Sequence, residues 1–264
     1  MPTTYTHDLF GKEVYRKLPS EMKQVIRKHG NLYRIGLHGP DILFYFMVSK
    51  NPVSRFGVEM HKEKAKAFFE QGMKQVREEG DEALLAYLLG FGCHYLLDSA
   101  CHPYVDEMAD KKIVSHTILE KEFDRALMLV TGKDPYHFYP SDCIVPRWKY
   151  AKVIHKALPL VRTVNIFISL KMMKVLTNAM VCDDGGRRKR RIGHILKLGG
   201  PSGEALLEHF MEKEPVEGSQ GPLSEFRRLY NEALLETPDY LRELYSLTEG
   251  EYRLSARWNR TYNG

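Results

Sequence analysis

The chain has 264 residues and a formal net charge of +5, and 43% of its residues are hydrophobic and 28% are charged. This length and composition can bury a substantial core, so we expect an ordinary globular protein of one domain with an appendage. The mild positive charge does not by itself indicate a nucleic-acid partner. We find neither the apolar core of a signal peptide nor the roughly 18–20 uncharged apolar residues of a membrane-spanning helix, and we expect a cytoplasmic protein.

The N-terminal part is expected to form short helices within irregular structure up to residue 57. Asp41 follows Gly39-Pro40, which predicts a turn at this carboxylate. An amphipathic helix is predicted from Val58 to Glu79, with His61 in its first turn.

The stretch from 81 to 106 dominates the sequence. Nearly every residue from Ala83 to Leu97 is apolar, and Asp81 is a plausible N-cap, so a buried helix is predicted here. Pro103 is expected to end this helix at His102, because the residue before a proline disfavours helical geometry.

This helix carries three potential metal ligands four residues apart. His94, Asp98 and His102 therefore share one stripe. His94 and His102 would lie roughly 12 Å apart along the axis, too far to bind one ion, so the spacing favours a polynuclear metal site with Asp98 between two ions. The plainer alternative is a hydrogen-bonded His–Asp pair in the core.

A second pair of ligand types follows. His116 and Glu120 share a face of a helix predicted from Ser115 to Thr131.

The rest of the chain is predicted as a loop over 132–148, a helix Val153–Met180 kinked at Pro159, a turn Gly199–Gly203, a helix Glu204–Lys213, a linker Glu214–Pro222 and a helix Ser224–Leu247 interrupted near Pro238. No strand pattern is convincing. We predict an all-α fold, with a helical domain over 1–180 and a C-terminal helical extension over 181–264 packed on it.

Two further features bear on the function, a run of basic residues and the four cysteines. A basic run follows Gly185-Gly186 and consists of Arg187, Arg188, Lys189, Arg190 and Arg191. We expect a solvated, mobile loop, or alternatively a patch for an anionic surface such as lipid headgroups or nucleic acid. No stable protein partner is predicted.

The four cysteines lack C-x-x-C spacing and are Cys93, Cys101, Cys143 and Cys182. Cys93 and Cys101 would lie about 12 Å apart on one helix, too far for a disulfide. We expect reduced thiols, with metal ligation by one of them as the alternative.

The candidate ligands are imidazoles and carboxylates, a set that suits zinc and tolerates other first-row divalent ions. They are His7, Asp41, His61, His94, Asp98, His102, His116 and Glu120. Ferritin-like di-iron bundles use Glu-x-x-His pairs with several glutamates, so the pairs found here favour zinc hydrolysis over oxygen chemistry. The alternative is that these pairs only join helices and hold no metal.

In this order on an all-α chain, the motifs resemble those of the zinc-dependent phospholipase C family, whose fold zinc-dependent single-strand nucleases share. The motifs are Gly39-Pro40-Asp41, His61, His94-x-x-x-Asp98-x-x-x-His102 and His116-x-x-x-Glu120. The resemblance is firm over about residues 5–130 and covers the remainder only as further helices.

The resemblance implies up to three zinc ions in a cleft. It assigns Asp41, His61, His94 and Asp98 to a first ion, His102, His116 and Glu120 to a second, and Asp98 and His7 to a third. Secreted relatives complete the third site with an N-terminal tryptophan exposed by signal cleavage, whereas the tryptophans here are Trp148 and Trp258. An amine exposed by removing Met1 would be a substitute. Two or three ions are therefore expected.

The implied reaction is phospholipase C-like hydrolysis of a phosphodiester by a metal-bridging water, with Asp41 orienting or deprotonating that water. A nuclease or phosphomonoesterase on the same fold is the first alternative. Aromatic side chains for base stacking are available at Tyr33, Tyr45, Tyr104, Tyr136, Phe138 and Tyr139, although we expect most to be core. An HD-type phosphohydrolase would rest on His7-Asp8 alone. The non-enzymatic alternative is a module that binds anionic lipid or nucleic acid and contains structural zinc.

Overall fold

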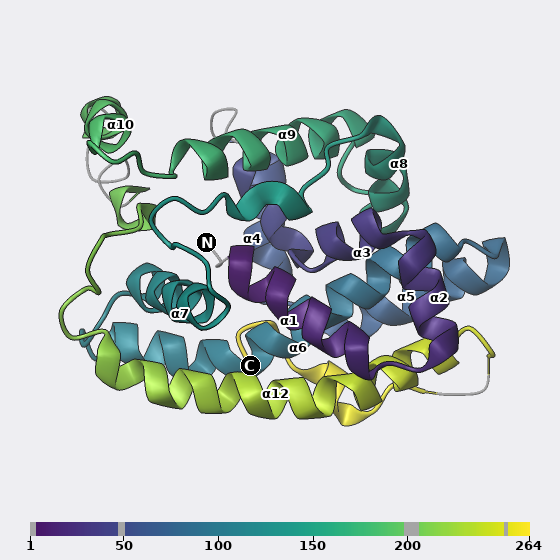
Figure 1. The fold of residues 1–264 in the computed structure, drawn as a ribbon. Coiled ribbons are helices and arrows are strands. Elements are labelled where there is room, and N and C mark those ends of the chain that lie inside the picture. Colours follow the sequence, from purple (N-terminus) through teal and green to yellow (C-terminus); the bar gives the residue numbers. More distant parts are fainter. Residues whose placement is uncertain (1–3, 47–50, 198–205, 251–252) are drawn as a thin grey trace.

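The computed structural model describes residues 4–46, 51–197, 206–250 and 253–264, and these ranges are helical without a strand (Figure 1). The predicted all-α fold is confirmed. The α-helices are α1 (Thr4–Lys17), α2 (Ser20–Lys28), α3 (Gly30–Gly36), α4 (Pro52–Met60), α5 (Ala65–Glu79), α6 (Glu82–Asp110), α7 (His116–Val130), α8 (Trp148–Ala157), α9 (Thr163–Ala179), α10 (Arg187–Lys197) and α12 (Gln220–Ser246). The 3-10 helices are η1 (Gly39–Tyr45), η2 (Pro140–Cys143), η3 (Leu206–His209) and η4 (Ala256–Asn259).

Helix α6 is the centre of the fold, with α12 along one side and α3 on another (Figure 1). Asp81 caps it as predicted, because its carboxylate accepts the Ala83 and Leu84 N–H groups at 3.0 Å. Helix α3 packs directly on the α6 backbone, since a Cβ at Gly90 would lie 2.1 Å from the Tyr33 carbonyl oxygen. This close approach fixes the position of the chain segment that leads into η1.

The predicted end of the central helix at His102 is wrong. Helix α6 continues through Pro103 to Asp110. A proline removes one backbone hydrogen bond, whereas the helix is buried along most of its length, so packing outweighs the local preference. Arg257 also donates to the Leu96 carbonyl and the Ser99 hydroxyl in the turn before the proline.

Other boundaries differ from the predictions where polar residues or prolines interrupt the apolar pattern. The predicted helix Val58–Glu79 is two helices, α4 and α5, and His61 lies between them. The predicted helix Val153–Met180 is likewise divided into α8 and α9 around Pro159, whereas α12 continues through Pro238 without the predicted interruption. The predicted turn Gly199–Gly203 lies outside the described residues, as do the first two residues of the predicted helix Glu204–Lys213, of which the structure shows the short η3.

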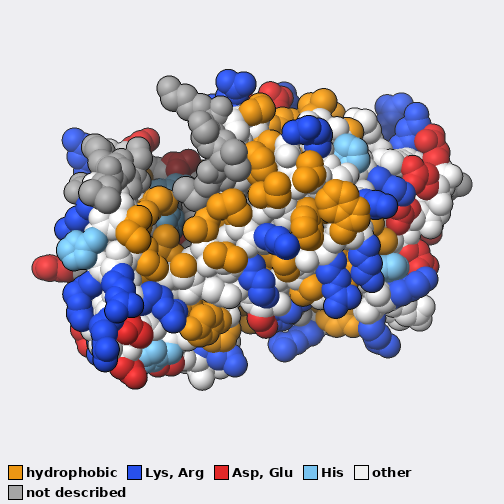
Figure 2. Space-filling model, turned by 90° about the horizontal axis from the view of Figure 1, so that it is seen from above, with side chains coloured by type: hydrophobic (Ala, Val, Ile, Leu, Met, Phe, Trp, Pro, Cys, Tyr) orange, Lys and Arg blue, Asp and Glu red, His pale blue; other side chains and the backbone are white. Residues whose placement is uncertain are grey.

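The basic run is also helical rather than a loop. It forms the first part of α10, in which Arg187, Arg190 and Arg191 are exposed. Figure 2 shows the face that carries α8, α9 and α10, where hydrophobic side chains lie among lysines and arginines. The exposed large hydrophobic residues of this region include Trp148, Leu160, Val164, Val175 and Ile195.

By length and composition, α6 could cross a membrane, contrary to the expectation that no stretch has such a composition. However, 94% of its apolar window is buried by other parts of the fold. A buried core helix passes the same compositional test as a membrane span. The division of the chain at residue 180 stays a prediction.

Candidate metal centre

The stripe on α6 places three ligand types in the interior of the protein. His94 is fully buried, and Asp98 and His102 are 3% and 8% exposed. An isolated carboxylate at such a position is very costly unless it is paired or bound to metal. The side chains around Asp98 therefore indicate whether the stripe is a metal site or a hydrogen-bonded pair in the core.

A first group of side chains surrounds one end of Asp98. It consists of His7, Asp41, His94 and Asp98, which each offer a ligand atom within 4.8 Å of the others. The Asp98 Oδ1 atom lies 3.2 Å from His7 Nε2, and its Oδ2 atom lies 3.0 Å from His94 Nε2. Four buried side chains from three elements thus converge on one point.

The position of Asp41 depends on a glycine. Gly39 has a φ of +47°, and a Cβ there would lie 2.1 Å from the His94 ring. Glycine alone avoids both costs, so the chain can pass close to His94 and present Asp41 from η1. The sequence predicted a turn here, and the structure has the related 3-10 helix.

His61 contacts this group from its edge. Its Nε2 atom lies 3.0 Å from Asp41 Oδ1, and its Nδ1–H donates to the Gly57 carbonyl at 2.8 Å. The resemblance placed His61 on the first ion and His7 on a third. The structure places His7 within the first group and His61 beside it, and the assignment of each residue to an ion stays a prediction.

A second group lies one turn further along α6. Its members are His102, His116 and Glu120, and Glu120 Oε1 lies 3.4 Å from His102 Nε2 and 3.2 Å from His116 Nε2. Asp98 Oδ1 lies 3.7 Å from His102 Nε2, so this carboxylate stands between the two groups. The structure therefore brings all eight predicted ligands into one continuous cluster.

Several ligand atoms make no geometrically sound hydrogen bond among the described residues. They are buried and include Asp41 Oδ2, Glu120 Oε2, and the close pair His94 Nε2 and Asp98 Oδ2, which lie 3.0 Å apart without hydrogen-bond geometry. Buried polar atoms are ordinarily satisfied, so such orphans point to an absent bonding partner. A cation among them would supply it, and the nitrogen and oxygen donor set fits zinc. The residues present thus fit the metal.

The opposite ring nitrogens of three histidines are held by oxygen acceptors, as is usual for metal-ligating imidazoles. Besides the His61–Gly57 contact, His116 Nδ1–H donates to Asp106 at 2.9 Å and His102 Nδ1–H donates to the Asn263 side-chain oxygen at 3.3 Å. Each bond directs the Nε2 atom of its ring toward the cluster. Sequence reasoning missed Asp106 and Asn263.

A continuation of the stripe would have found Asp106, which lies four residues after His102 and is part of the same helix. Asn263 carries no comparable local signal, because it reaches the site from the C-terminal end. Tyr262 is another missed neighbour: it is 1% exposed, and its ring centroid lies 5.4 Å from that of His61 and 6.0 Å from that of His94.

The carboxylates and imidazoles of the cluster shift one another's pKa values. Burial alone would lower the pKa of His102, but the Asp98 and Glu120 carboxylates raise this pKa to about 10. Burial would raise the pKa of Asp98, but the adjacent imidazoles, led by His102, hold it well below its ordinary value. With a pKa of about 10, His102 holds a proton at pH 7 in the absence of a cation, so metal binding at this ring must displace that proton.

Two other hypotheses from the sequence are an HD-type site at His7-Asp8 and metal ligation by a cysteine. Asp8 makes two hydrogen bonds to Arg34, at 2.7 and 2.8 Å, and does not join His7 in the cluster, which argues against the HD-type interpretation. All four cysteines are free and buried, and the two ligand groups found among the described residues contain no thiol. Cys143 instead lies 3.2 Å from His38 Nε2.

The sequence model of the family described as zinc dependent phospholipase C matches residues 6–162, well over half of the chain. The chain belongs to the zinc-dependent phospholipase C family. The match contains all eight predicted ligands and Asp106, whereas α9, α10, α12 and the C-terminal contacts lie beyond it. No match to the chain is found among curated proteins or among solved structures.

Proposed function

We propose that this member of the zinc-dependent phospholipase C family hydrolyses phosphodiesters of the phospholipase C type with at least two zinc ions. The observation that carries the proposal is the pair of ligand groups joined by Asp98, with unpartnered buried ligand atoms in both. His7, Asp41, His94 and Asp98 would hold one ion, with His61 beside them, and His102, His116 and Glu120 would hold another. When bound, the ions lower the pKa of a water molecule and neutralise charge that develops on the phosphoryl oxygens.

Asp41 is the residue we propose as the base. Its Oδ1 atom is held 3.0 Å from His61 Nε2, whereas its Oδ2 atom is buried without a hydrogen-bond partner among the described residues and lies 3.8 Å from His94 Nε2. One oxygen is thus fixed while the other is free to orient the attacking water or to accept its proton. His61 keeps the carboxylate in place because its own ring is anchored by the Gly57 carbonyl.

A lipid substrate is the class that family membership suggests, and the surface features of this chain support it. Lys189 pairs with Glu212, and Arg188 donates to the Val181 carbonyl at 3.0 Å, so these two cations are used within the fold. Arg187, Arg190 and Arg191 are exposed at one end of a face that also exposes hydrophobic side chains (Figure 2). Such a combination suits an anionic lipid surface. We also propose a cytoplasmic location, supported by the four free thiols.

A panel of chromogenic substrates tests the proposal. The zinc-loaded protein should hydrolyse a generic phosphodiester and a phosphocholine ester faster than a phosphomonoester, and chelation should abolish the activity. Preference for the monoester, or cleavage of single-stranded nucleic acid alone, would favour the corresponding alternative. No hydrolysis of any phosphoester by fully zinc-loaded protein would favour a binding module with structural zinc.

The variant Asp41→Asn separates the proposed base from the fold. The amide is nearly isosteric with the carboxylate, so the far-ultraviolet circular dichroism should stay unchanged. Turnover of the phosphodiester at saturating zinc should fall by about 10²–10⁴-fold, the usual contribution of a general base. Wild-type turnover would remove Asp41 from the proposed role.

A further inference from the structure

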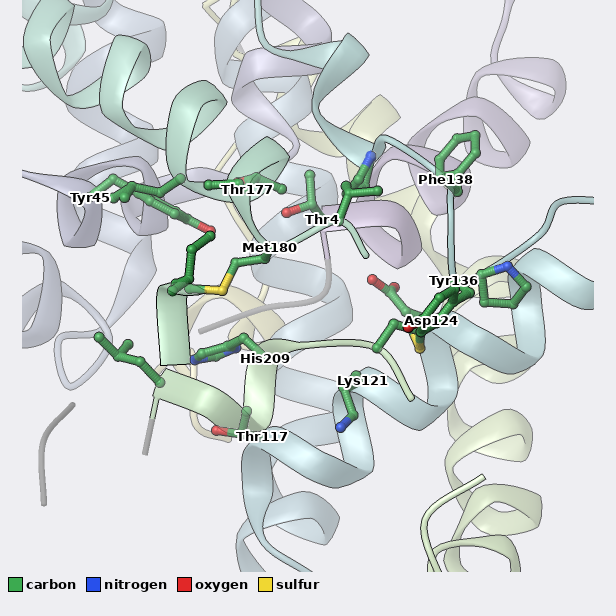
Figure 3. A pocket seen from close by; sticks show the side chains of 18 of the residues that line it. Thr4, Tyr45, Thr117, Lys121, Asp124, Tyr136, Phe138, Thr177, Met180 and His209 are labelled. Atoms are coloured by element: carbon green, nitrogen blue, oxygen red, sulfur yellow. The ribbon is translucent and has the colours of Figure 1, made fainter. Parts of the chain in front are cut away.

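A cavity of about 380 Å³ lies beside the metal centre, within the size range of small-molecule sites (Figure 3). Its walls come from η1, α7, the 135–140 segment, the C-terminal part of α9, α10 and the region of η3. Much of this wall lies beyond the region that the family model matches. The cavity is therefore built jointly by the matched region and by the helices that follow it.

Two elements join the cavity to the metal centre. The Phe44 ring lines the cavity and stacks on the His61 imidazole with centroids 5.3 Å apart. On α7, the cavity-lining Thr117 directly follows His116. A ligand in the cavity would thus extend from a point beside both ligand groups.

The interior of the cavity is largely apolar, and Met128, Leu176, Met180, Ile192 and Leu196 are among its lining residues. Figure 3 shows Met180 and Phe138 on opposite sides of the space. This lining can bind an apolar chain by removing it from water. It offers little to a charged headgroup.

The two ordinarily charged residues of the wall, Asp124 and Lys121, make hydrogen bonds within the fold, and His209 is uncharged. Asp124 accepts the Thr6 N–H at 2.7 Å, and its second oxygen accepts the Tyr5 N–H at 3.4 Å, so it caps α1. Lys121 donates to the Phe210 carbonyl at 3.2 Å. Burial lowers the pKa of His209 to about 4, so its ring is neutral at pH 7.

We propose that this cavity binds the apolar chain of an amphiphilic phosphoester while the metal centre acts on its phosphate. The inference rests on the proposed hydrolysis of phosphodiesters and specifies the substrate class. Helix α10 supports such a ligand, because it contributes Ile192 and Leu196 to the cavity, while Arg190 and Arg191 on its exposed side suit an anionic lipid surface from which the ligand would enter. The apolar chain would be a linear acyl chain or a branched isoprenyl chain, which share this chemistry.

A binding experiment tests the cavity independently of catalysis. Butyl, octyl and dodecyl phosphate, together with farnesyl phosphate and inorganic phosphate, are titrated calorimetrically into zinc-loaded protein below micelle-forming concentrations. Affinity should rise by about two- to fourfold for each added methylene until the cavity is filled. Tighter binding of farnesyl than of dodecyl phosphate would identify an isoprenyl chain, and the reverse an acyl chain. Equal affinity of butyl and dodecyl phosphate would overturn the proposal.

Two neighbouring tryptophan substitutions sharpen the test. Leu196→Trp fills the cavity, whereas Ile195→Trp places the same ring on the outer side of α10, where Ile195 is 68% exposed. The first variant should weaken dodecyl phosphate binding at least tenfold and abolish the dependence on chain length, and the second should keep both. Equal behaviour of the two variants would contradict the proposal.

The two proposals fail in different ways. If the protein hydrolyses the chromogenic phosphodiester but shows no dependence on chain length, the cavity proposal fails and the hydrolase proposal stands. If chain-length dependence is found without hydrolysis of any phosphoester, the hydrolase proposal fails and the cavity still binds apolar chains.

Discussion

Asp98 has a different neighbour at each of its carboxylate oxygens. Its Oδ2 atom faces His94, whereas its Oδ1 atom lies between His7 and His102. Asp41, in contrast, forms its ion pairs among the described residues with His61 and His94, on the side of the first group. The two aspartates are therefore not equivalent, although both are buried in the same cluster.

This difference predicts different metal contents in two isosteric variants. Asp98→Asn should reduce zinc binding in both ligand groups, because the amide removes the one negative charge that they share, whereas Asp41→Asn should reduce mainly one equivalent. Zinc per chain is measured by elemental analysis after gel filtration. Two tightly held equivalents in Asp98→Asn would show that Asp98 does not connect the groups.

Asp106 acts on the metal centre through His116, whose Nδ1–H it accepts. The substitution Asp106→Asn should weaken zinc binding at the second group by about 10–100-fold, the usual effect of removing such an orienting partner. Competition with a fluorescent chelator measures this loss. Asp110→Asn, a change at an exposed acidic residue one turn later in α6, is the matched control and should leave the affinity unchanged.

At the scale of elements, α6 combines a capped start with a backbone packed directly on α3. Burial would raise the pKa of Asp81, but Lys156 and the first N–H groups of α6 lower it. The stabilisation by this charge is thus fully present above the carboxyl pKa of the unfolded chain, about 3.9, and is lost as the pH falls through the lower native value.

The variant Asp81→Asn isolates that charge, because asparagine is an equally good N-cap. Its free energy of unfolding in urea should be below that of the wild type at pH 7, and the difference should shrink as the pH falls from 5 toward 3. A difference that is constant over this range would indicate that the charge makes no contribution.

The close packing of α3 on α6 predicts the response to two small substitutions. Gly90→Ala should destabilise the protein by about 1–3 kcal/mol or more, because the added methyl group meets the Tyr33 carbonyl and neither backbone can move freely. Gly30→Ala is the control, since a Cβ there meets nothing within 4 Å, and its effect should stay within about 0.5 kcal/mol. Equal unfolding midpoints in urea would contradict the packing argument.

At the scale of the whole molecule, the cluster predicts at least two zinc equivalents per chain. Removing them should lower the melting temperature, and added zinc should restore it in a concentration-dependent way, because a ligand that binds only the folded state stabilises it. Calorimetry after chelation and repletion measures both effects. One equivalent or fewer in the repleted protein would contradict the polynuclear interpretation.

The sequence sufficed for features set by local periodicity. Apolar spacing predicted the buried central helix, and His-x-x-x-Asp and His-x-x-x-Glu spacing predicted which faces carry ligands. The rule that a helix ends before a proline failed at Pro103, because packing maintains the helix there. Since the predicted helix ended at His102, Asp106 was not recognised as part of the same stripe. The cavity and the contact of Asn263 could not be predicted, because they depend on how distant segments meet.

His7 and Asn263, close to the two ends of the chain, both contact α6, and the Tyr262 N–H donates to the His61 carbonyl at 3.1 Å. These contacts have very large separations along the sequence, and such contacts form slowly because the entropy of loop closure must be lost first. We therefore expect the cluster of candidate ligands to be completed late in folding. A chain that ends after α12 would contain all eight predicted ligands but would lack the contacts of Tyr262 and Asn263 with His61 and His102, and we expect it to retain zinc less tightly.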